Sequence, residues 1–258
     1  MQRPQGGPST GQVSPSSSSS PSPSVSVRIE HGDALVLLSQ IPDGVIDTVF
    51  TDPPYSSGGL HRSARAAGHS SRKYIASADR FQDFAGDRMD QRSYERWSVF
   101  WLSSAYRVTE PGGALVMATD WRQIALVSDC VQMAGWTLRG VVPWLKPNAR
   151  PWFGRYRQSA EFFVWATKGD RDLDPDLPCL PGHVTASPPR GCDRLHPTQK
   201  PDEILRELLP ITRPGGIVLD PFCGSGAVVR IARDLGYSAI GFEISAHYAA
   251  IARAEVSR

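Results

Sequence analysis

The sequence lacks the features of a membrane protein, of a secreted protein and of a protein stabilised by zinc or disulfides. No apolar run approaches the roughly 20 residues of a membrane-spanning helix, and no apolar segment near the N-terminus suggests a secretory signal. Only four cysteines occur, none in a CxxC spacing, so we expect free thiols and no bound metal. These absences predict a protein of the reducing cytoplasm that makes no membrane contact.

A strong excess of charge is also missing. The formal net charge is +2, so any nucleic-acid surface must be a local patch rather than a global field. Residues 1–25 are mainly Ser, Pro, Gly and Gln, a composition that cannot bury enough apolar surface to offset its ordering entropy. We therefore predict a disordered tail at 1–25 and one domain over 26–258.

The most informative stretch is Asp52-Pro53-Pro54-Tyr55. It follows the apolar, β-branched segment 45–50, which predicts a buried strand, and α/β sheets place ligands where such strands end. Two prolines in a row fix φ twice and give a stiff turn with free carbonyls. Asp52 and the carbonyl of Pro53 can accept the two N–H bonds of a flat amine, and Tyr55 can stack on its ring.

A second motif, Asp220-Pro221-Phe222-Cys223-Gly224-Ser225-Gly226, follows the predicted strand 216–219. Its glycines let a ligand approach the backbone without meeting a Cβ atom. A helix over 227–235 and a strand over 238–243, ending at Glu243, complete the pattern. Alone, this pattern fits a dinucleotide equally well, because an acid that holds ribose hydroxyls serves several nucleotide ligands.

Together the two motifs, DPPY and FCGSG, resemble the amino-methyltransferases of DNA, which carry a (D/N/S)PP(Y/F/W) motif and an FxGxG motif. The segment His196-Pro197-Thr198-Gln199-Lys200-Pro201 resembles the HxTQKP segment that precedes the cofactor half of that family. The resemblance covers about residues 27–256. DPPY and HPTQKP favour this family over the nicotinamide oxidoreductases, which share only the glycine-loop pattern.

The resemblance implies S-adenosyl-L-methionine as cofactor and double-stranded DNA as substrate. It implies four catalytic residues: Asp52, Pro53, Pro54 and Tyr55. It implies nine cofactor-binding residues and no metal: Asp33, Thr198, Lys200, Asp220, Phe222, Gly224, Ser225, Gly226 and Glu243. Asp33 is expected near the adenine of the cofactor, and it is also suited to cap the helix predicted over 34–38.

The order of the motifs predicts a circular permutation. The strands of the glycine loop and of Glu243 come last, so the third strand of the cofactor half must come from the N-terminal side, where the strand 25–30 fits. This order matches the permuted β class of the resembled family. We therefore predict an α/β, Rossmann-like methyltransferase fold with a mainly parallel seven-stranded sheet and a reversed edge strand.

The elements between the motifs are read from hydrophobic spacing. A helix is predicted over 94–108, and Pro111-Gly112-Gly113 predicts a turn before the strand 114–118. The segments 136–145 and 161–166 predict an antiparallel strand pair at the edge of the sheet.

Three loops are candidates for contact with DNA. Residues 56–93 predict a mobile, DNA-facing loop, and residues 169–195 a short target-recognition insert. Residues 146–158 interleave basic and aromatic side chains, which suits backbone contact with stacking, although an ordinary edge loop has the same composition. The first loop carries a basic cluster suited to phosphate contact: Arg62, Arg65, Arg72 and Lys73.

We predict a site-specific methyltransferase that acts on N6 of adenine in duplex DNA. Asp52 favours adenine, because Ser is usual at this position in the cytosine-N4 enzymes of the same fold. Methylation of RNA or of a protein amide, and a catalytically idle DNA-binding protein, are the alternatives; the intact motifs argue against the idle one. Association with the nucleoid, a homodimer and a cognate restriction enzyme are further expectations.

Overall fold

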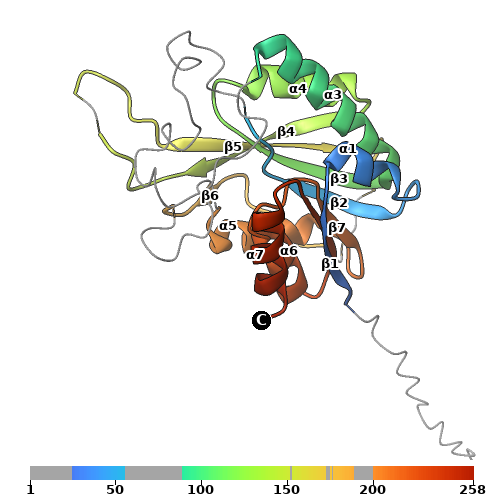
Figure 1. Cartoon of the computed structure of the whole chain (residues 1–258). Helices are drawn as coiled ribbons and strands as arrows, with labels where there is room; N and C mark the ends of the chain where they lie inside the picture. The colour runs from blue at the N-terminus through green and yellow to red at the C-terminus, as the bar shows by residue number, and fades with distance from the viewer. Residues whose placement is uncertain (1–24, 56–88, 152, 173–174, 176, 189–199) are drawn as a thin grey trace, which may run out of the picture.

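The computed structural model describes residues 25–55, 89–151, 153–172, 175, 177–188 and 200–258 (Figure 1). The basic cluster at 62–73, Thr198 and almost all of the predicted tail lie outside the described residues. No helix in the described part of the chain is long and apolar enough to cross a membrane.

The described residues form an eight-stranded sheet with the order β1-β8-β7-β2-β3-β5-β4-β6. Its strands are β1 (Val27–His31), β2 (Ile46–Thr51), β3 (Thr109–Thr119), β4 (Thr137–Leu145), β5 (Ala160–Thr167), β6 (Val184–Thr185), β7 (Ile217–Asp220) and β8 (Ser238–Glu243). The first five strands of this order are parallel, whereas β5 is antiparallel to both of its neighbours. The predicted α/β, Rossmann-like fold is confirmed.

Two details of the sheet differ from the prediction of seven strands with a reversed edge strand. An eighth strand, β6, comes from the predicted insert at 169–195 and pairs Val184 with Trp144. The reversed strand is β5, and it lies between β3 and β4 rather than at the edge. The hydrophobic pattern identified the antiparallel pair, but it could not say which of the two strands would also pair with β3.

The predicted permutation is confirmed by the pairing of β1 with β8. Val27 is opposite Ala239 and His31 is opposite Glu243, so the first and last strands of the chain lie side by side (Figure 1). The Cα partners run in parallel, which the prediction of a third cofactor-side strand requires.

Helices cover both faces of the sheet (Figure 1). One face carries α1 (Ala34–Ser39), α3 (Gln91–Val108) and α4 (Ile124–Met133). The other face carries α5 (Asp202–Leu208) with its short extension η4 (Leu209–Ile211), α6 (Ala227–Asp234) and α7 (Ala246–Val256). Because both faces are covered, β2 is buried along its whole length, including its polar residues Asp47, Thr48 and Thr51.

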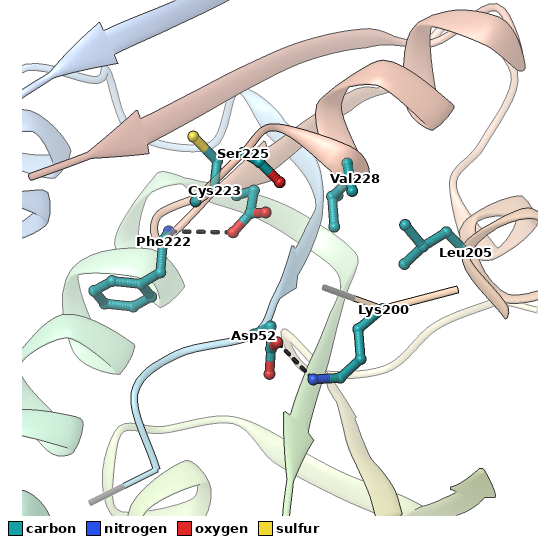
Figure 2. A pocket seen from close by; sticks show the side chains of 10 residues that line it. Asp52, Lys200, Leu205, Phe222, Cys223, Ser225 and Val228 are labelled. Atoms are coloured by element: carbon teal, nitrogen blue, oxygen red, sulfur yellow. Dashed lines mark hydrogen bonds and ion pairs between the residues drawn. The ribbon is translucent and has the colours of Figure 1, made fainter. Parts of the chain in front are cut away.

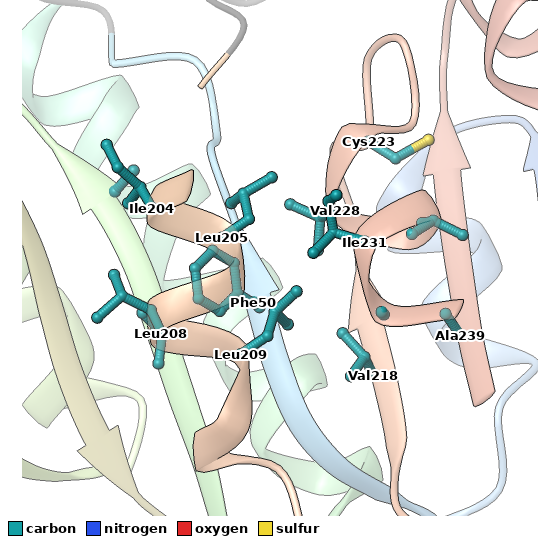
Figure 3. Close-up of a cluster of buried hydrophobic side chains, with 14 of the residues drawn as sticks. Phe50, Ile204, Leu205, Leu208, Leu209, Val218, Cys223, Val228, Ile231 and Ala239 are labelled. Atoms are coloured by element: carbon teal, nitrogen blue, oxygen red, sulfur yellow. The ribbon is translucent and has the colours of Figure 1, made fainter. Parts of the chain in front are cut away.

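The core is divided in two by the sheet. Phe50 points to one face and meets Leu205 and Leu209 in the cluster that Figure 3 shows. Val49 points to the other face and belongs to the cluster around Trp101. This alternation follows from the two-residue period of a strand, and it fixes β2 between two packed layers.

The predicted turn at Pro111-Gly112-Gly113 is instead an irregular part of β3. The register with β2 jumps from Ile46 opposite Thr109 to Thr48 opposite Ala114, so additional residues bulge on the β3 side. Gly112 has a positive φ of 75°. A Cβ atom on Gly113 would lie 2.7 Å from the carbonyl oxygen of Asp47, so the bulge requires a residue without a side chain there.

We therefore expect Gly113→Ala to destabilise the fold by about 1–3 kcal/mol, because the new methyl group forces backbone to move. Thermal unfolding should show a lower Tm than the parent, and Gly182→Ala is the matched control because nothing lies within 4 Å of a Cβ atom there. Equal Tm values for the two variants would contradict this account of the bulge.

Candidate active site

The site lies at the topological switch point of the sheet, between the neighbouring strands β7 and β2. The chain leaves β7 through α6 toward β8, and it leaves β2 through α3 toward β3, on the opposite side. Open α/β sheets bind ligands at the carboxyl ends of the two strands that flank such a point. Thr51 ends β2 and Asp220 ends β7, and the Thr51 hydroxyl donates a hydrogen bond of 2.7 Å to the Asp220 carboxylate.

A pocket at this point is lined by both sequence motifs (Figure 2). Its empty space, including the part open to solvent, is about 400 Å³. The structure brings six of the predicted site residues to its wall: Asp52, Lys200, Asp220, Phe222, Gly224 and Ser225. The remaining lining residues are ones that sequence reasoning missed: Leu205, Cys223, Ala227 and Val228. Leu205 and Val228 have ordinary core spacing, so the sequence carries no signal that they face a pocket.

Asp52 is held by two donors. The Tyr55 hydroxyl lies 2.5 Å from Oδ1, and the Lys200 ammonium lies 2.5 Å from Oδ2, across 148 residues of sequence. Lys200 is also 3.0 Å from the Tyr55 hydroxyl oxygen. Of the prolines between Asp52 and Tyr55, Pro53 is buried and Pro54 is half-buried. Lys200 was predicted to bind cofactor; it lines the pocket, but its ammonium points at the carboxylate of the turn (Figure 2).

Glu161, at the start of β5, is a functional candidate that the sequence did not reveal. Its carboxylate lies 3.7 Å from the Lys200 ammonium and also pairs with Lys146. Burial would raise the pKa of Glu161, but the two lysines outweigh burial and lower this pKa. A single Glu within an apolar strand carries no motif, so only the tertiary structure shows that it belongs to the site.

The acid at the end of β8 is fixed by backbone donors. Glu243 accepts hydrogen bonds from the N–H groups of Gly224 at 2.9 Å and Ser245 at 2.8 Å. Burial raises the pKa of Glu243, and these two donors oppose that effect. Asp33 follows the neighbouring strand β1, and its carboxylate accepts a 2.8 Å hydrogen bond from Leu35 N. The predicted capping role of Asp33 is confirmed, whereas its contact with a cofactor stays a prediction.

Gly226 is constrained by protein packing. Its φ is +85°, and a Cβ atom there would lie 2.9 Å from the Cβ atom of Ala252 on α7. The close approach of α7 therefore explains this glycine, whereas Gly224 lies in the pocket wall. A contact between Gly226 and a cofactor stays a prediction.

The Phe222 ring points away from Asp52 and Lys200 (Figure 2). Its centroid lies 5.3 Å from that of Trp97 and 5.1 Å from that of Trp101, in the layer formed by α3. This aromatic contact anchors the glycine loop to α3. Within the described ranges, no group of three or more His, Cys, Asp or Glu side chains could hold a metal ion.

This fold and site define a Rossmann-like methyltransferase in which an Asp-Pro-Pro-Tyr turn faces a glycine-rich loop across the pocket. The family model for DNA methylases matches residues 46–183 and 176–254, so the chain belongs to the DNA methylase family. S-adenosylmethionine is the methyl donor of that family. The predicted family and cofactor are confirmed.

The chain is similar to the type II methyltransferase M2.DpnII of Streptococcus pneumoniae. The two are 30% identical over 246 residues, which cover 86% of this chain and 87% of that protein. The structure of M1.HpyAVI with S-adenosylmethionine has a TM-score of 0.65 at 22% identity, covering 90% of this chain and all of that one. The PvuII cytosine-N4-specific DNA methyltransferase has a TM-score of 0.68 at 18% identity, covering 89% and 86%. These two structures show the same fold.

Asp220 generates a prediction about pH. It is 2% exposed, and burial raises its pKa from the ordinary value of 3.8 to about 7, although Thr51 and Phe222 N–H donate hydrogen bonds to it. Between these two values the folded protein binds more protons than the unfolded chain. The free energy of unfolding should therefore fall as pH rises from about 4 to about 7.

Asp220→Asn cannot titrate but keeps an acceptor for Thr51 and Phe222. We expect its stability relative to the parent to increase between about pH 5 and about pH 8, as measured by denaturant unfolding of the cofactor-free proteins. Asp170→Asn, at a fully exposed position, is the control. If the free energies of unfolding of Asp220→Asn and the parent differ by the same amount at both pH values, the raised pKa of Asp220 is contradicted.

Proposed function

We propose that this protein is a site-specific adenine-N6 methyltransferase that acts on duplex DNA. The observation that carries the proposal is the shared pocket, in which Asp52 and Lys200 form one side and the glycine loop forms the other (Figure 2). A methyl donor held by the loop would therefore face the acceptor group that orients the target amine. Membership of the DNA methylase family supports the same reaction.

The residues of the pocket wall and of the neighbouring strand ends fit S-adenosylmethionine. Glu243 presents a carboxylate fixed by two backbone donors, which suits the hydroxyls of a ribose. Asp33 stands at the neighbouring strand end, where it would lie near the adenine of the cofactor. When bound, the cofactor supplies an electrophilic methyl group on its sulfonium sulfur. Four residues of the pocket wall would hold its other parts: Asp220, Phe222, Gly224 and Ser225.

The catalytic turn would act by orienting the target amine. The exocyclic amine of adenine is a poor nucleophile, because its lone pair is delocalised into the ring. Asp52 and the Pro53 carbonyl would accept its two N–H bonds and turn the lone pair out of the ring plane. The base must leave the duplex to reach this turn, and Tyr55 would stack on it there. The nitrogen becomes acidic only after methylation, so Asp52 need not be a strong base.

Adenine is preferred over cytosine because Asp, rather than Ser, stands at position 52. The fold does not separate the two targets, since the cytosine-N4-specific PvuII enzyme shares it. Single-molecule sequencing of plasmid DNA from cells that express the protein reports both the modified base and its sequence context. N6-methyladenine in one short motif is expected. Detection of N4-methylcytosine instead would show that the target base is cytosine.

A homodimer, a restriction partner and association with the nucleoid stay predictions.

We expect Asp52→Ala to lower kcat by about a hundredfold or more, or ~3 kcal/mol, because it removes an acceptor aligned with the reacting amine. Binding of S-adenosylmethionine should change little, and calorimetry can measure it in the same preparation. Asp170→Ala is the control for the loss of a carboxylate at a fully exposed site. Near-normal methylation by Asp52→Ala would rule out this turn as the active site.

The loop between β4 and β5 is the part of the described surface best suited to DNA. It extends from the left side of the sheet in Figure 1, and Leu145 and Ala160 pair at its base. Phe153 and Tyr156 are fully exposed within this loop, and Arg155 and Arg157 are exposed beside them in sequence. Residues 146–160 contain no acidic side chain. Exposed aromatic rings between cations suit a nucleic-acid strand, by backbone attraction and by stacking.

Replacing both Arg155 and Arg157 by Gln should weaken DNA binding and flatten its salt dependence. Each lost phosphate contact should reduce the slope of log affinity against log salt by about 0.9. Fluorescence anisotropy over a salt series measures the slope. The control replaces Arg28 and Arg258, which lie on β1 and at the C-terminus, by Gln. An unchanged slope for the loop variant would exclude these arginines and leave the predicted cluster at 62–73 as the contact.

A further inference from the structure

Lys200 is a buried cation shared by two carboxylates. Its side chain is 6% exposed, and its ammonium lies 2.5 Å from Asp52 Oδ2 and 3.7 Å from Glu161 Oε2. A charge this deeply buried is stable only when it is paired, and removal of one partner leaves the others uncompensated. The position of the Asp52 carboxylate therefore depends on Lys200.

The two oxygens of Asp52 have different partners. Oδ2 accepts from the charged Lys200, whereas Oδ1 accepts from the neutral hydroxyl of Tyr55. Hydrogen bonds to ionised donors are the stronger kind, so a target amine that needs an acceptor displaces the Tyr55 hydroxyl more readily than Lys200. The exchange leaves Lys200 on Oδ2 and opens Oδ1 to the substrate.

Glu161 is the second carboxylate that pairs with Lys200. It lies on β5 and is paired in register with Trp144 of β4, so its backbone is part of the sheet. Lys146, whose ammonium lies 4.6 Å from the centroid of the Trp144 ring, also pairs with the Glu161 carboxylate. The two acids, Asp52 and Glu161, balance the charge of the two lysines, Lys146 and Lys200. The pairing of β5 with β4 fixes the backbone of Glu161.

We propose that Lys200, anchored by Glu161, is a positioning residue for methyl transfer: it holds Oδ2 of Asp52 so that Oδ1 faces the target amine. This inference rests on the proposed reaction at Asp52. It assigns Lys200 to the catalytic carboxylate rather than to the cofactor, and it adds Glu161 to the residues that the reaction requires.

The test uses the full-length protein and compares Lys200→Met, Glu161→Gln and the double variant. Lys200→Met keeps the length of the side chain and removes its charge, and we expect kcat to fall by about tenfold to a hundredfold. The dissociation constant for S-adenosylmethionine and the KM for DNA should stay within about twofold, a split that simple loss of folded protein does not give. Glu161→Gln should lower kcat less, and it should add little in the double variant, because it acts through Lys200.

The control is Lys168→Met, since Lys168 is also partly buried but donates to backbone carbonyls of Arg107 and Thr109. Its kcat should equal that of the parent. Weaker cofactor binding by Lys200→Met with unchanged kcat would overturn the inference and make Lys200 a cofactor ligand. If the fold-loss of kcat in the double variant equals the product of the fold-losses in the two single variants, the role of Glu161 is overturned. If Lys200→Met does not fold, unchanged kcat of Glu161→Gln overturns the inference. A parent protein that does not methylate DNA would instead refute the proposed function.

Discussion

The pairing of β2 with β7 is the contact on which the site depends. The register sets Val49 opposite Leu219, so the two strands end together and place Asp52 beside the glycine loop. The hydrogen bond from Thr51 to Asp220 links the ends of the two strands. The ring of Phe222 packs against Trp97 and Trp101 and holds the glycine loop in place. A shift of register would separate the turn from the loop, because the pairing of β2 with β7 brings the two strand ends together.

Charge balance is the second constraint on the pocket. Four acids lie at one edge of the sheet: Asp52, Glu161, Asp220 and Glu243. They are stabilised in three different ways. Asp52 and Glu161 are paired with lysines, Glu243 is held by backbone N–H groups, and Asp220 has its pKa raised by burial. Separate solutions for neighbouring acids allow one of them to present an oxygen to a substrate without mutual repulsion.

The interior position of the reversed strand has a consequence for the site. Because β5 is antiparallel to β3, its first residues lie at the carboxyl edge of the sheet, and its place between β3 and β4 puts them next to β3. Glu161 therefore lies at the base of the loop that we propose to contact DNA, and one lysine away from Asp52. The surface proposed for the substrate and the carboxylate proposed to orient its amine share this short chain of ion pairs.

The sequence by itself determined the family, the α/β fold, the permutation and the two motifs, because strand ends, prolines and glycines encode local geometry within a few residues. It also determined that Asp33 caps α1, a contact between positions two residues apart. Only the tertiary structure decided which strand of the hairpin pairs with β3, that Ala252 explains Gly226, and that Lys200 and Glu161 meet Asp52. Those contacts join residues far apart in the chain, and no local spacing records which distant side chain a strand or helix will bring to them.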